Sequence, residues 1–193
     1  MVPERAKRGR LKLALIGLFF ALPFALAWTA YWLHWTPGQA GNYGELLRPP
    51  RQVPGGGLVG LDGKPFTLAS LRGKWVMLQF DAAACDAYCE RKLYFMRQLR
   101  VAQGKDRNRV ERVWILTDSG MPRQALMAAI DGTYVVRAAD ATVAESLPPG
   151  GRAQDHIYLI DPLGNLMMRF PRDPDPSKML KDLQRLLKIS QIG

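Results

Sequence analysis

The sequence predicts an α/β fold, a central mixed sheet flanked by helices, preceded by a single N-terminal transmembrane helix. Short apolar runs alternate with amphipathic patterns, an uncharged stretch lies near the N-terminus, and one compact segment follows it. The 193 residues carry a formal net charge of +10 and are 48% hydrophobic, which is typical of a globular chain. Only two cysteines and two histidines are present, which excludes zinc ribbons, multi-disulfide scaffolds and His-rich metal sites.

The N-terminal 35 residues predict a membrane anchor. Residues 1–12 form a basic flank, and residues 13–35 contain no Asp, Glu, Lys or Arg. At about 1.5 Å per residue, that uncharged run spans roughly 34 Å as a helix, enough for a bilayer core. Its C-terminal end is rich in aromatic rings, which favour the interface. The alternative is a signal peptide cleaved after Ala27.

The basic flank is expected to stay cytoplasmic, since positive charge beside a membrane span is retained on the inner side. In a Gram-negative bacterium the chain would then be a single-pass protein of the inner (cytoplasmic) membrane with its C-terminal domain in the periplasm. Residues 36–57 are rich in Gly and Pro and predict an irregular tether. Residues 58–193 are left as one domain of thioredoxin-like size and pattern.

The first half of this domain predicts a hairpin, a strand and a helix. Asp62-Gly63 between short apolar runs is typical of a hairpin turn. The nearly continuous apolar run at 75–80 predicts a buried strand. Residues 86–103 have helical spacing that places apolar side chains on one stripe, and Gly104 is the expected end of this helix.

The second half continues the alternation of strands and helices. Pro122 favours the start of a helix, and Pro162 to Asn165 favour a hairpin turn. The expected elements are strands at 112–118 and 133–138, helices at 122–130 and 141–147, paired strands at 156–161 and 166–170, and an amphipathic helix at 176–189. This order is typical of an α/β sandwich of thioredoxin type.

Cys85 and Cys89 lie four residues apart, where the strand at 75–80 meets the next helix. Thiols at positions i and i+4 can share one metal ion or, with some adjustment of the first turn, form a disulfide. Unpaired N–H groups at a helix N-terminus stabilise a thiolate, which favours a reactive or metal-binding sulfur. Buried core cysteines and a structural disulfide are the alternatives. A loop this short stabilises a fold little, so function is the preferred interpretation.

Several motifs resemble those of the SCO/SenC family. They are the strand at 75–80 followed by Cys85-Asp86-Ala87-Tyr88-Cys89-Glu90, then WILTDSGMP, then Asp155-His156 before YLIDPLGN. The resemblance covers about residues 58–188 and the anchor, and implies a thioredoxin-like domain that delivers copper, as Cu(I) or Cu(II), during cytochrome c oxidase assembly. It implies Cys85, Cys89 and His156 as metal ligands, with Asp118 as a supporting acidic residue.

The sequence departs from that family in two places. Proline usually follows each cysteine there, whereas Asp86 and Glu90 stand here, so proline does not set the helix start. His156 lies closer to its strand than the family histidine does. A shift of one residue along a strand points a side chain to the opposite face of the sheet. His156 on the surface, or held by a hydrogen bond, is therefore an open alternative.

Three functions follow from this pattern. The first is a membrane-anchored copper chaperone or assembly factor, with the lipid bilayer and a respiratory oxidase subunit or another assembly factor as partners. The second is a thiol-disulfide oxidoreductase with Cys85 and Cys89 as catalytic residues. The third is an inert thioredoxin-like interaction module.

Two weaker signals lie outside these motifs. Between Arg91 and Arg112 there are eight basic residues against two acids, but no nucleic-acid motif accompanies them. A solvated helix face is the first interpretation, and docking to acidic lipid or an acidic partner the second. Met167 and Met168 could supply a soft metal ligand, although paired methionines in a strand more often serve packing.

Overall fold

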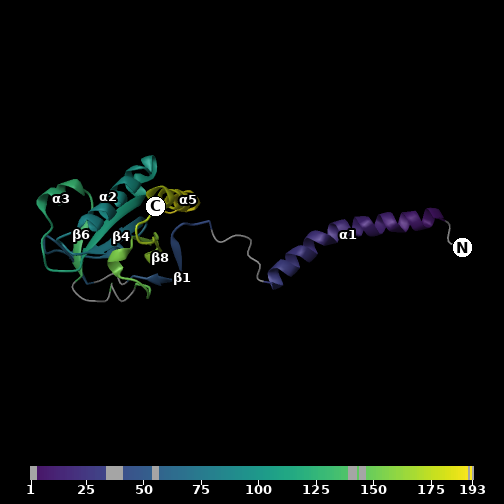
Figure 1. Ribbon diagram of the computed structural model, residues 1–193, viewed down its shortest axis with the longest axis horizontal. Coiled ribbons are helices and arrows are strands. Elements are labelled where there is room, and N and C mark those ends of the chain that lie inside the picture. The colour runs from purple at the N-terminus through teal and green to yellow at the C-terminus, as the bar shows by residue number, and fades with distance from the viewer. Residues whose placement is uncertain are drawn as a thin grey trace. The chain divides into compact units, whose positions relative to one another are not determined.

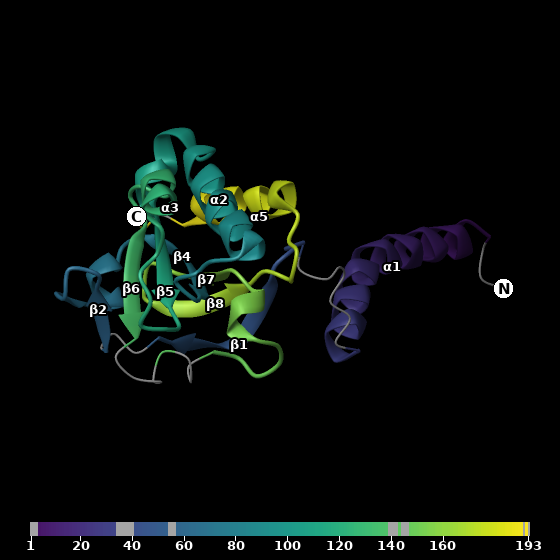
Figure 2. The same cartoon turned by 60° about the vertical axis from the view of Figure 1, so that its left-hand side comes forward.

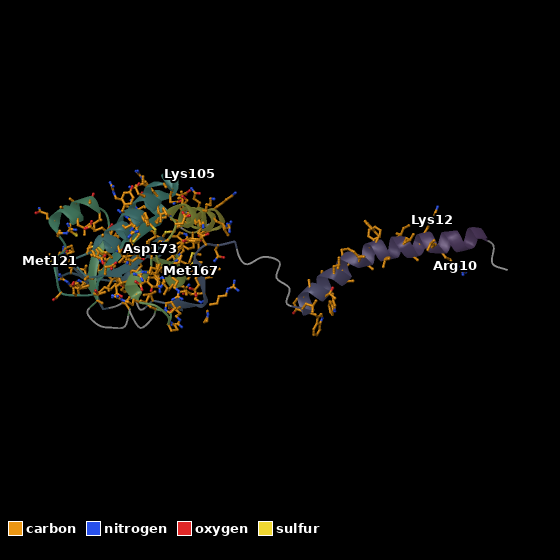
Figure 3. All side chains as sticks on the ribbon, in the orientation of Figure 1. Arg10, Lys12, Lys105, Met121, Met167 and Asp173 are labelled. Carbon is orange, nitrogen blue, oxygen red and sulfur yellow. A yellow bond between two sulfur atoms is a disulfide. The ribbon has the colours of Figure 1, made fainter. Side chains whose placement is uncertain are left out.

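The computed structural model describes residues 4–33, 41–53, 57–138, 143, 147–190 and 192. The chain divides into two compact units, Met1–Gly41 and Asn42–Gly193 (Figure 1). The first unit contains one helix, α1 (Glu4–Trp32), and its stretch Gly9–Trp32 is long and apolar enough to cross a membrane, with a mean hydropathy of 2.1. Figure 3 labels Arg10 and Lys12 on the N-terminal half of α1. His34 and Trp35 of the expected span lie outside the described residues.

The second unit is built on one mixed sheet of eight strands in the order β1-β8-β7-β4-β5-β6-β2-β3. The central strands β4, β5 and β6 are parallel, and β7 runs antiparallel to β4. The strands are β1 (Glu45–Gln52), β2 (Leu58–Gly60), β3 (Pro65–Phe66), β4 (Trp75–Asp81), β5 (Val110–Leu116), β6 (Tyr134–Ala138), β7 (Tyr158–Ile160) and β8 (Asn165–Arg169). The fully buried pattern of β4 and β5 agrees with their apolar sequences.

Helices α2 (Ala87–Val101), α3 (Gln124–Ala129) and α5 (Pro176–Ile189) complete the fold, with short 3-10 turns η1 (Leu68–Leu71), η2 (Gly104–Arg109) and η3 (Ala153–Asp155). Figure 2 shows α2 and α5 side by side over the central strands. Between them and the sheet lies a core that includes Met77, Met96, Leu159 and Leu183. The opposite face carries a second core around Phe80 and is closed partly by η1, so the sheet is sandwiched as predicted.

The prediction of an irregular tether at 36–57 is wrong for residues 45–52. Residues 45–52 form strand β1, which pairs antiparallel with β8 at the edge of the sheet. Proline is tolerated there because an edge strand leaves one row of N–H groups unpaired, and the pairing register shifts between Leu46 and Arg51, around Pro49 and Pro50. The domain therefore begins at Asn42 instead of residue 58. Residues 36–40 and 54–56 of that segment lie outside the described residues.

The other predicted elements are confirmed within a few residues of their expected bounds. The hairpin at β2 and β3 turns at Gly63, whose φ of 79° favours glycine. The C-terminal helix spans Pro176–Ile189, with Asp175 as its N-cap accepting from the N–H groups of Ser177 and Lys178. The expected helix at 141–147 lies, except for Val143 and Leu147, outside the described residues.

Candidate thiol site at the start of helix α2

Cys85 and Cys89 form a disulfide, with their Cα atoms 5.2 Å apart. Cys85 precedes the helix and has a φ of 38°, in the left-handed region that residues other than glycine rarely occupy. This backbone conformation turns the chain so that the sulfur of Cys85 meets that of Cys89 in the first turn of α2. Strained backbone of this kind clusters at functional sites.

Asp86 takes over the part that proline plays in the resembling family. Its Oδ1 accepts a hydrogen bond of 2.9 Å from the N–H of Cys89, so Asp86 is the N-cap of α2. Glu90 lies in the first turn, where the helix dipole favours an acidic side chain, and pairs with Arg123. The helix start is thus set by an acidic cap instead of a proline ring.

The disulfide is enclosed on the helix side of the sheet. Cys85 is 4% exposed and Cys89 is 1% exposed, and both pack with Leu93, Trp114 and Leu116. Buried Gln79 on β4 donates to the Sγ of Cys89 at 3.7 Å. Cys85 also lines a cleft, so it is the cysteine that a partner would reach first.

Asp118 supports the loop in front of the cysteines. Its Oδ1 accepts from the N–H of Ala83 at 3.0 Å and from the N–H of Gly120 at 3.3 Å. It therefore fastens the segment before Cys85 to the end of β5.

The cleft beside Cys85 has a volume of about 410 Å³ and is bordered by charged side chains. Its lining comes from the end of β4, the start of α2, the η3 region and the segment after β8, and includes Asp81, Cys85, Tyr88, Arg152, Asp155 and Arg172. A cleft of this size can accept a peptide side chain or a short chain segment next to the disulfide. Both signs of charge border it, so it suits a polar partner.

A buried ion pair forms the base of this region. Lys92 on α2, 1% exposed, places its Nζ 2.6 Å from the Oδ2 of Asp81 at the end of β4. The same ammonium donates to the carbonyl of Gln154 and lies 5.0 Å from the ring centre of Tyr88. It thereby ties the helix that carries Cys89 to the opposite wall of the cleft.

Burial dominates the electrostatics of this pair. Loss of solvent raises the pKa of Asp81 above its ordinary value, against the opposing effect of the Lys92 charge. Loss of solvent likewise lowers the pKa of Lys92, with Asp81 opposing the shift. Burial also raises the pKa of Tyr88, whose hydroxyl donates to the carbonyl of Asp155. Sequence patterns missed Asp81 and Lys92, although a charged residue ending a buried strand is a signal that could have identified the first.

The structure gives the ring of His156 partners other than the cysteine pair. The Nδ1 of His156 donates to the carbonyl of Phe170 at 2.7 Å, and Nε2 faces Gly151. Its ring packs edge-on against Tyr158, which belongs to the core on the sheet face opposite α2. Among the residues that the structure describes, no three His, Cys, Asp or Glu side chains gather as a metal site. The two sulfurs are therefore the soft ligands that the fold brings together.

Comparison with known proteins identifies a family and a fold. Residues 75–190 match the family described as "Transmembrane-like, thioredoxin-like, C-terminal domain". No curated protein matches the sequence.

Solved structures with the same fold include copper proteins and redox proteins. Bradyrhizobium japonicum ScoI with copper bound is 23% identical, with a TM-score of 0.52 over 70% of this chain and 96% of that one. Yeast Sco1 with copper bound is 16% identical, with a TM-score of 0.58 over 79% and 96%. The thioredoxin domain of a thiol-disulfide oxidoreductase from Bacteroides vulgatus is 19% identical, with a TM-score of 0.50 over 70% and 97%. These likenesses confirm the predicted thioredoxin-like fold.

Proposed function

This chain belongs to the transmembrane-like, thioredoxin-like C-terminal domain family, and we propose that it is a membrane-anchored assembly factor that carries Cu(I) on its reduced cysteine pair. The observation that carries the proposal is the placement of Cys85 and Cys89 around the first turn of α2, with Cα atoms 5.2 Å apart and a cleft beside Cys85. The Sco structures, two of which hold copper, support the choice of cargo.

The chemistry of the pair suits a soft monovalent cation. Reduction of the disulfide by two electrons and two protons gives two thiols, and thiolates select Cu(I) over hard cations. Cys85 lies directly before the first turn of α2, the end of a helix at which the dipole favours negative charge. His156 is the proposed third ligand, and its ring must release the Phe170 carbonyl to take that part. The disulfide is the metal-free form of the carrier.

The proposed setting follows from α1. We assign α1 to the inner membrane of a bacterium with the basic flank in the cytoplasm, and the thiol domain to the periplasm. A respiratory oxidase subunit, or another assembly factor, is the proposed recipient of the copper. In this compartment a thiol pair meets an oxidising environment, which accounts for a disulfide resting state.

A Cu(I) titration of the full chain in detergent, against a competing chelator, tests the proposal. The reduced protein is expected to bind one equivalent, and the disulfide form and Cys85→Ser are expected to bind none. His156→Ala reports on the third ligand, and Met121→Leu, at an exposed methionine, is the matched control. Equal affinity of Cys85→Ser and the unmodified protein would refute the proposal.

A thiol-disulfide oxidoreductase is the second candidate, favoured by the buried Asp81–Lys92 pair, because Asp81 lines the same cleft as Cys85. Cys85 thiolate would attack a partner disulfide, forming a mixed disulfide while the displaced partner sulfur takes a proton. Cys89 would then attack Cys85, closing the intramolecular disulfide and releasing the second partner thiol. The partner is reduced by two electrons and this chain is oxidised by two.

Turnover assays with a disulfide substrate and a dithiol reductant separate the two candidates. An oxidoreductase is expected to reduce the substrate catalytically, and Asp81→Asn is expected to change the pH profile of that rate. A carrier binds Cu(I) without such turnover. Loss of turnover in Cys85→Ser with no change in Asp81→Asn would remove the carboxyl from the mechanism.

A further inference from the structure

One face of α5 is uniformly cationic. Lys178, Lys181, Arg185 and Lys188 are exposed and recur at intervals of three, four and three residues, so they form one stripe along the helix. Met179, Leu183 and Leu187 occupy the buried face. A basic amphipathic helix of this kind is typical of a membrane-surface element.

Two acidic residues lie in α5 or at its start. The one acid within α5, Asp182, is 4% exposed and points into the domain. The N-cap residue Asp175 lies 3.9 Å from Lys178, at the first end of the stripe. The segment from Asp175 to Ile189 thus keeps a formal net charge of +2, from four basic residues against two acids.

The stripe continues past the end of α5. Lys188 and Lys105 line the same cleft, where η2 meets the last turn of α5, and the one acid in its lining, Asp106, pairs with Arg109. Figure 3 shows Lys105 at this outer end of the domain. Ile189, 72% exposed, and Val101, 60% exposed, add apolar side chains at the ends of α5 and α2. Cations interleaved with exposed aliphatic groups match the headgroup region of a bilayer.

The chain enters the domain beside this helix. The N–H groups of Tyr43 and Gly44 each donate to the Oδ2 of Asp182 at 2.8 Å. The part of the chain that follows α1 in sequence therefore enters the domain beside α5.

We propose that the exposed face of α5 docks on anionic phospholipid headgroups of the membrane that holds α1. Near such a surface each Lys or Arg contributes about 1 kcal/mol, or roughly a fivefold bias. Lys181, Arg185 and Lys188 together shift the docked-to-free ratio by on the order of a hundredfold. The Cys85 cleft lies at the other end of α2 from Lys105, so docking leaves it open to a partner.

Headgroup quenching in the full chain tests this docking. A bimane dye is attached to Gln184→Cys, at an exposed position beside the stripe, and the protein is reconstituted with quencher-labelled lipid. Bilayers of phosphatidylcholine are compared with bilayers that also contain phosphatidylglycerol. Strong quenching is expected only with phosphatidylglycerol, and it is expected to fade as added salt screens the charges.

Two triple variants decide whether the stripe is responsible. Lys181→Gln with Arg185→Gln and Lys188→Gln is expected to lower the docked-to-free ratio by on the order of a hundredfold. The matched control removes three exposed cations away from α5, through Arg51→Gln, Lys64→Gln and Arg72→Gln, and is expected to keep the quenching. Equal quenching in both lipids, insensitivity to salt, or equal loss in both variants would overturn the proposal.

Discussion

Replacing Lys92 by methionine tests the buried ion pair directly. Methionine keeps the length and apolar stem of the side chain but removes the ammonium that contacts Asp81 and the Gln154 carbonyl. The Asp81 carboxylate, 11% exposed, then loses the ammonium that lies beside it. Removing one member of a buried pair costs about 3–5 kcal/mol, because the remaining charge is desolvated and uncompensated.

That cost is a large part of the stability of a domain this size. Folded domains are stable by about 5–15 kcal/mol, so Lys92→Met is expected to remove roughly a fifth or more of the free energy of unfolding. For about 150 residues, each kcal/mol lowers the melting temperature by roughly 2–4 °C. The expected drop is therefore about 6–20 °C. Asp81→Asn is expected to destabilise by a similar amount, since it leaves a buried ammonium unpaired.

The two single variants should respond to pH in opposite directions. In Lys92→Met the pKa of Asp81 is raised further, so ionising this carboxyl costs folding free energy. The loss of stability is then smallest near pH 4 and grows as pH rises through the raised pKa. In Asp81→Asn the pKa of Lys92 is lowered further, so the loss is present at neutral pH and eases as pH rises toward 10.5.

Urea unfolding of the full chain in detergent, followed by circular dichroism with the disulfide intact, measures these changes. The double variant Asp81→Asn with Lys92→Met completes a thermodynamic cycle, and it is expected to lose less than the sum of the two single variants. Arg91→Met, at an exposed neighbour on the same helix, is the matched control and is expected to change little. A loss below about 1 kcal/mol in Lys92→Met, or additive losses in the cycle, would refute the buried pair.

Three further changes have defined outcomes. Gly44→Ala would place a Cβ 2.5 Å from the Sδ of buried Met168, so the melting temperature should fall by the equivalent of about 1–3 kcal/mol, and unchanged melting would contradict this packing. Asp86→Ala removes the cap on the Cys89 N–H and should cost about 1 kcal/mol in urea unfolding, with Asp86→Ser restoring most of it. Burial raises the pKa of Tyr158 to about 12, so its phenolate should appear in an ultraviolet titration near that pH, with stability declining from pH 10 upward; ionisation at pH 10 would argue against burial.

The fold was predictable because its strong signals are local. The apolar run of β4, the helical stripe of α2 and the Asp175-Pro176 start of α5 each depend on a few neighbouring residues. Strand β1 was missed because its proline-rich sequence makes no strand by itself. It becomes one only through pairing with β8, more than a hundred residues later in the chain.

Part of the site was also local. The proximity of Cys85 and Cys89 followed from their spacing, but their conformation did not, because Cys85 lies outside α2 with a left-handed backbone. The pairing of Asp81 with Lys92 depends on how α2 packs on the end of β4. No short-range pattern contains that packing, so the pair required the tertiary structure.

The position of His156 along its strand decides which face of the sheet its ring joins, and this bears on whether it can share a metal with the cysteines. Along the extended segment before and through β7, Ile157 and Leu159 join the core under α2 and α5, whereas Tyr158 and Ile160 join the core on the other face. His156 has the parity of Tyr158 and packs against its ring, while the Sγ of Cys89 lies on the α2 side beside Gln79. For His156 to share a metal with the thiols, the segment must turn at this residue and give up the bond from Nδ1 to the Phe170 carbonyl, a hydrogen bond whose net contribution is about 0.5–1.5 kcal/mol. In the proposed copper carrier that cost is small beside metal–thiolate bonding, so the two cysteines are expected to determine whether copper binds and His156 how the third position is filled.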